Sequence, residues 1–177
     1  MDLRDFVRQT MELVRQRTMN MIQGVTQEQL RFQPHPDANH AGFLLFHIFR
    51  TEDRYFHDWV TTSGEVWERG GWSRRWQLPS PPSNSNPIWT IGNSWTIEEV
   101  RGWQPPPLKE LLEYGEAVRV GAFEVVRDLD LARLDEVPRP ERPDWSVAYY
   151  LRQGSLHEAA HQGQMDYALG ILRASRA

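Results

Sequence analysis

The sequence predicts an all-α protein in which four long helices pack as an antiparallel bundle. Four segments carry apolar residues at the three- and four-residue spacing of amphipathic helices, and no stretch shows the convincing alternation of a strand. Proline- and glycine-containing segments separate these four. A chain of 177 residues suits one domain, and no internal repeat suggests a second, so we expect a single domain over residues 1–177.

The first helix is expected over roughly residues 3–21, where the apolar positions form one stripe. Asp2 is the candidate N-cap, and Gly24 is a plausible C-terminal stop. The following Thr-Gln-Glu-Gln at 26–29 resembles a capping box that opens a short helical turn.

The second helix is expected from Ala41 to about Val60, after the helix-breaking Pro34 and Pro36, with Asn39 as its cap. Large apolar side chains cover a wide arc of this segment. Such a helix is expected to be buried on more than one side.

Residues 61–107 predict a long Trp/Pro-rich connection between the second and third helices, with seven prolines and most of the tryptophans. Its helical signal is a capping box at 96–99. Because disordered segments are poor in aromatics, the tryptophans indicate that this connection packs against the rest of the protein.

The third helix is expected over about 108–130, entered through three consecutive prolines at 105–107. The fourth follows further prolines and runs to about Arg173, with Ser146 or Asp144 as its cap.

Composition excludes several classes of function. The formal net charge is −4 and no Lys/Arg block stands out, which argues against nucleic-acid binding. There is no cysteine, so disulfides, thiolate metal ligands and a cysteine nucleophile are absent. The N-terminal residues lack the apolar run of a signal peptide, and no stretch approaches the roughly 20 apolar residues that span a bilayer. We therefore expect a cytoplasmic protein that does not bind membranes.

The candidate functional site rests on His157 and His161, which lie one turn apart and about 40° apart around the fourth helix. Two imidazoles at this spacing can bind one metal ion, although two unrelated histidines on an amphipathic helix would look the same. His47 is the preferred third ligand because an imidazole amid apolar neighbours needs a polar partner, which a backbone carbonyl could also supply. His40 is the reserve candidate, and His35 and His57 look like ordinary loop and surface histidines.

The same segment matches the His-Glu-x-x-His pattern of zinc proteases, in which the glutamate is the general base. Glu158 would have that role here. Such proteases normally take their third ligand from downstream, but Asp166 is the only carboxylate after His161 and no further histidine follows. A third ligand from an upstream helix fits better.

At this point the chain resembles the DinB/YfiT-like superfamily of suspected metalloenzymes. The likeness is carried by residues 44–53, a second-helix block of His47 followed by Arg-x-Glu-Asp, and by the last-helix pattern His-x-x-x-His-x-Gly-Gln at 157–164. The resemblance implies an up-down-down-up four-helix bundle, often a homodimer, with three histidines binding one divalent ion such as zinc or nickel. Characterised relatives include transferases and isomerases that use the small thiols bacillithiol or mycothiol.

This assignment predicts a metal-dependent enzyme, a thiol S-transferase or a hydrolase, acting on a small molecule. Three neutral imidazoles leave a coordination position open, and without cysteine any thiolate must come from outside the chain. Arg50 is expected either to bind an anionic substrate group or to pair with Asp53. Gln164 is expected to orient a ligand, hold water or contact substrate. Glu158 is expected to act as a base, to cap the edge of the site or to face solvent. The alternatives are a non-catalytic metal- or ligand-binding stress protein and a zinc protease.

Overall fold

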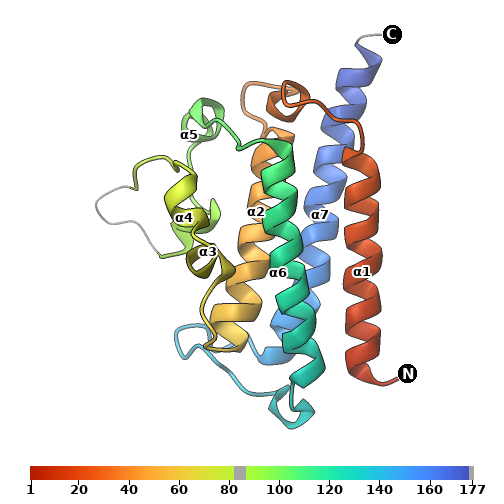
Figure 1. The fold of residues 1–177 in the computed structure, drawn as a ribbon, viewed down its shortest axis with the longest axis vertical. Coiled ribbons are helices and arrows are strands. Elements are labelled where there is room, and N and C mark those ends of the chain that lie inside the picture. The colour runs from red at the N-terminus through yellow and green to blue at the C-terminus, as the bar shows by residue number, and fades with distance from the viewer. Residues whose placement is uncertain (82–86, 176–177) are drawn as a thin grey trace.

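The structure, a computed structural model, describes residues 1–81 and 87–175, and within these ranges it contains helices and no strand. This confirms the all-α prediction. Four helices are much longer than the rest: α1 (Leu3–Ile22), α2 (Ala41–Asp53), α6 (Leu108–Asp128) and α7 (Val147–Ala174). They lie side by side, with α1 and α7 running upward in Figure 1 and α2 and α6 running downward. None of the described helices is both long and apolar enough to cross a bilayer.

The ends of these helices follow from local sequence signals. Asp2 caps α1 by accepting a hydrogen bond from the Asp5 amide at 2.9 Å, and Ser146 caps α7. The predicted cap of α2 was wrong by one residue. His40, and not Asn39, accepts the Phe43 amide through Nδ1 at 3.0 Å.

Helix α2 lies at the centre, and each of its thirteen residues is buried. It continues into the π-helical segment η2 (Arg54–Val60), so the predicted second helix spans two elements. It packs against α6, where Gly115 allows the Phe49 ring to approach. A Cβ built on Gly115 would lie 2.5 Å from Phe49 Cε2. Burial of the apolar side chains of α2 supplies the main driving force for packing the helices around it.

The segment expected to be a long irregular connection contains short helices among its described residues. These are α3 (Val66–Arg69), α4 (Trp72–Arg75) and α5 (Ile97–Gly102), with the 3₁₀ turn η3 (Pro87–Ile91). Outside this segment, the chain forms two further 3₁₀ turns, η1 (Gln29–Arg31) and η4 (Leu131–Arg133). Thr96 and Glu99 form the predicted capping box of α5. Several tryptophans of this segment are buried against α2 and α6: Trp67, Trp72, Trp76 and Trp103. The segment therefore covers one side of the long helices, as Figure 1 shows.

Candidate metal centre

Three imidazoles meet between α2 and α7. His157 Nε2 lies 3.1 Å from His47 Nε2 and 3.2 Å from His161 Nε2, and one ligand atom of each histidine lies within 4.8 Å of the other two. A tetrahedral ion with metal–nitrogen bonds of about 2.0–2.1 Å holds its nitrogens about 3.4 Å apart. The three histidines selected from the sequence therefore form a group that could hold a metal ion.

The outer nitrogens of two rings fix their tautomers. His47 Nδ1 lies 2.5 Å from the Ile91 carbonyl oxygen, and His161 Nδ1 lies 2.9 Å from the side-chain oxygen of Gln164. Both oxygens are acceptors, so both Nδ1 atoms donate a proton and both Nε2 atoms direct a lone pair into the group. Partners of this kind orient the histidine ligands of metal sites.

The three Nε2 atoms suit binding to a shared cation better than hydrogen bonding to one another. With His47 and His161 presenting lone pairs, only His157 could carry a proton on Nε2, and one N–H cannot give two full hydrogen bonds. A single cation among the three nitrogens would satisfy all the lone pairs at once.

Burial keeps two of the rings, His47 and His157, in the neutral form that metal binding requires. It lowers the pKa of His47 to about 4, although the Ile91 carbonyl favours the charged form. Burial also lowers the pKa of His157 to about 3, and the neighbouring His47 and His161 add to this shift. Both rings are therefore neutral near pH 7, and metal binding does not first have to remove the extra proton of an imidazolium.

Gln164 and part of the connection complete the surroundings of the imidazoles. Gln164 contacts His161, one of the positions expected for it. Phe43 stacks on His47 with ring centroids 5.9 Å apart, and Trp95 packs on Phe43 at 5.4 Å. Trp72, from the same connection, packs on Trp76 and Tyr114.

Glu158 does not join the imidazoles, and it is buried beside two arginines. Its carboxylate accepts hydrogen bonds from Arg15 Nε at 2.8 Å and from Arg119 Nη2 at 2.5 Å. Burial opposes its ionisation, but these two cations outweigh burial and lower the pKa of Glu158. This geometry does not favour the base role that the His-Glu-x-x-His pattern suggested.

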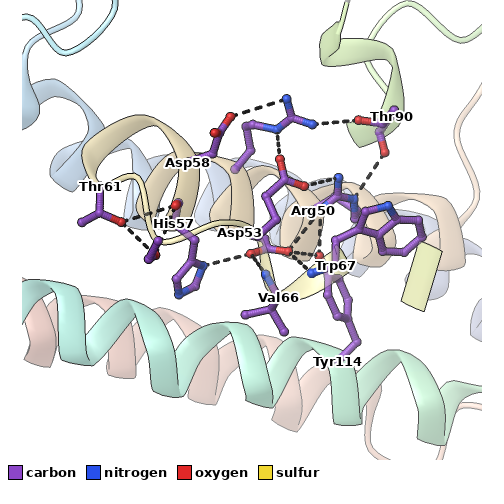
Figure 2. Close-up of polar contacts among 12 residues, drawn as sticks. Arg50, Asp53, His57, Asp58, Thr61, Val66, Trp67, Thr90 and Tyr114 are labelled. Atoms are coloured by element: carbon purple, nitrogen blue, oxygen red, sulfur yellow. Dashed lines mark hydrogen bonds and ion pairs between the residues drawn. The ribbon is translucent and has the colours of Figure 1, made fainter. Parts of the chain in front are cut away.

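Of the two roles expected for Arg50, the structure contains the ion pair with Asp53, at 3.1 Å, and the side chain is fully buried. The same guanidinium donates to Tyr114 Oη at 3.0 Å and to Glu65 at 2.7 Å, and it lies 4.4 Å from the ring centroid of Trp67. Figure 2 shows Arg50 beside Asp53, Trp67 and Tyr114. With these partners in place, the guanidinium is not presented to a substrate anion.

Two other histidines differ from their predicted settings. His57 is buried and not on the surface, because its Nδ1 pairs with Asp53 at 2.9 Å (Figure 2). His40 is the cap of α2, and its Nε2 lies 3.1 Å from the Val100 carbonyl oxygen, so the reserve ligand is engaged elsewhere. The sequence did not reveal the cluster around Asp53, although the spacing of Asp53 and His57 at i and i+4 was a usable signal.

The fold and the site define a helical protein with a three-histidine candidate metal centre. The family model of the DinB superfamily matches residues 10–165, and the chain therefore belongs to that superfamily. A solved structure described as a conserved protein from Enterococcus faecalis is similar over 98% of this chain and 99% of its own, with a TM-score of 0.84. At 16% identity this likeness shows the fold alone. No curated protein matches the chain significantly.

Proposed function

We propose that this protein is a metal-dependent enzyme that binds one divalent ion, zinc or nickel, through His47, His157 and His161. We also propose that the four long helices form a bundle of the up-down-down-up type. The observation that carries the proposal is the convergence of three Nε2 atoms, two of them with outward Nδ1 atoms held by acceptors. Three protein ligands leave a fourth position for water or substrate, the pattern of catalytic zinc sites.

The reaction class that best suits the site is thiol S-transfer. Hydrolysis is the second reaction class that the site would suit. A bound ion would lower the pKa of a ligated thiol or water and so supply a nucleophile at neutral pH. The chain has no cysteine, so the thiol must be a low-molecular-weight cosubstrate. Burial keeps the His47 and His157 rings neutral, and contacts with Ile91 and Gln164 hold the orientation of His47 and His161.

The competing candidate is a non-catalytic metal- or ligand-binding protein with a stress-related role. It draws support from Glu158, the one nearby carboxylate that the sequence offered as a base, because that group is engaged by two arginines. The same engagement weighs against a zinc protease.

We further propose that the protein works in the cytoplasm as a homodimer. The dimer finds support in an apolar groove of about 390 Å³ between α1 and α7. Phe6 and Leu156 line this groove with 57% and 53% of their surfaces exposed. Apolar surface of this kind is common where proteins associate.

The test of the metal site begins with chelator-treated wild-type protein titrated with Zn²⁺, Ni²⁺ and Co²⁺. We expect one ion per chain, and a large loss of affinity in His47→Ala with helicity preserved by circular dichroism. His35→Ala is the matched control, because its imidazole is exposed. Metal content unchanged in His47→Ala would remove His47 as a ligand and overturn the site.

The test of the activity follows on the same proteins. Conjugation assays with bacillithiol, mycothiol and glutathione are run with and without metal. Metal-dependent turnover that disappears in His47→Ala supports the enzyme. Stoichiometric metal binding without turnover supports the non-catalytic candidate, and casein hydrolysis that depends on Glu158 would revive the protease.

A further inference from the structure

Two arginines and two glutamates form a buried cluster that takes one residue from each long helix. Arg15 comes from α1, Glu52 from α2, Arg119 from α6 and Glu158 from α7. Arg15 Nη2 and Arg119 Nη2 each lie 2.8 Å from Glu52 Oε2, and the same two arginines hold Glu158 at 2.8 and 2.5 Å. Every member of the cluster is less than a tenth exposed.

A gain in stability is not a sufficient reason for burying these four charged side chains. Buried ion pairs lose most of their attraction to desolvation, and apolar residues of the same size often stabilise a core as well or better. A buried polar group can instead fix one relative arrangement of packed helices, since any other arrangement leaves charges unpaired. Here that arrangement includes the rotation of α7 about its axis.

The position of Glu158 connects this rotation to the metal centre. Glu158 follows His157 directly, so the two side chains leave α7 about 100° apart. Glu158 is held by α1 and α6, while His157 and His161 meet His47 of α2. Anchoring Glu158 therefore sets the direction in which both imidazoles of α7 point.

A small rotation of α7 would be enough to disturb the metal site, because metal–ligand distances vary little. A helix has a backbone radius of about 2.3 Å, so an imidazole nitrogen lies roughly 6–7 Å from the axis. A rotation of about 10° would move it by about 1 Å, whereas metal–ligand distances tolerate about 0.2 Å.

We propose that Glu158 is a positioning residue, which through Arg15 and Arg119 sets the rotation of α7 and so brings His157 and His161 to the metal-binding geometry. Glu158 acts through its arginine partners and touches no reacting group. This inference rests on the proposed metal site, but the geometry it predicts also exists without metal.

The first test is Glu158→Gln, which keeps the size of the side chain and removes its charge. We expect metal affinity to fall about 10- to 100-fold, as for other partners that orient metal ligands. We also expect a changed visible spectrum of the Co²⁺ form, because the ligand geometry shifts. Glu158→Asp retains the charge and should fall between wild type and Glu158→Gln; it also serves if the glutamine variant does not fold.

The matched control is Glu65→Gln. Glu65 is also a buried carboxylate paired with two arginines, Arg50 and Arg54, but it lies outside α7. It should lose stability while the metal affinity and the Co²⁺ spectrum stay near those of the wild type. Equal effects of the two substitutions on affinity would show a general structural role and overturn the proposal.

A crystal structure of the metal-free Glu158→Gln protein separates this inference from the proposed function. We expect the separation between His47 Nε2 and His157 Nε2, 3.1 Å in the wild type, to change by about 1 Å, because these two rings lie on different helices. An unchanged separation would overturn the positioning role. A wild-type protein that binds no metal would overturn the proposed function alone.

Discussion

Acidification should destabilise the metal-free protein through His47, and the size of the effect can be worked out. Burial lowers the pKa of His47 from 6.5 to about 4, so between these values the unfolded chain binds a proton that the folded chain does not. Stability therefore rises with pH in this range and is lost as the pH falls below 6.5. At pH 5 the difference is about 1.5 pH units, or about 2 kcal/mol at about 1.36 kcal/mol per unit.

Urea unfolding of metal-stripped wild type and His47→Gln at pH 7 and pH 5 measures this effect. Glutamine can still donate to the Ile91 carbonyl but has no proton to gain. The stability of the wild type relative to the variant should therefore fall by about 2 kcal/mol between the two pH values. His35→Gln, at an exposed histidine, should follow the wild type at both. Parallel pH dependence of wild type and His47→Gln would refute the reasoning, because it would mean that His47 titrates alike in the folded and unfolded states.

Two further predictions concern packing. Gly115→Ala should destabilise the protein because its Cβ would press on Phe49, and overpacking typically costs about 1–3 kcal/mol, partly offset by the better helix propensity of alanine. Gly170→Ala is the control, because beyond its chain neighbours and the backbone of its own helix no described atom lies within 4 Å of a Cβ placed there. Chemical denaturation that ranks the two variants equally would contradict the packing account. Phe6→Asp should turn a dimer into a monomer in light scattering, since it places a charge in the apolar groove of α1 and α7, and an unchanged dimer would place the interface elsewhere.

The helices could be predicted because their signals are local. Asp2, Ser146 and the capping box at Thr96 determine where helices begin through hydrogen bonds from amides three residues away. The predicted cap of α2 failed because the His40 imidazole takes the position that Asn39 was expected to fill. That ring is also held by the Val100 carbonyl, a contact from a distant part of the chain.

The three imidazoles of the candidate site were also within reach of the sequence. His157 and His161 share a helix face by their spacing alone, and His47 stood out as a polar ring in a strongly apolar helix. The roles of the neighbouring charged residues were not within reach. Arg50 had two open interpretations, and only the positions of Tyr114 and Glu65 showed that its guanidinium is enclosed.

By itself, then, the sequence determined the helical class, the approximate limits of the long helices and the three histidines, because helix periodicity and capping act over a few residues. The tertiary structure alone decided that Glu158 faces Arg15 and Arg119, and that the Ile91 carbonyl orients His47. These contacts join residues far apart in the chain. Their partners depend on how the helices rotate and pack against one another, which no local pattern specifies.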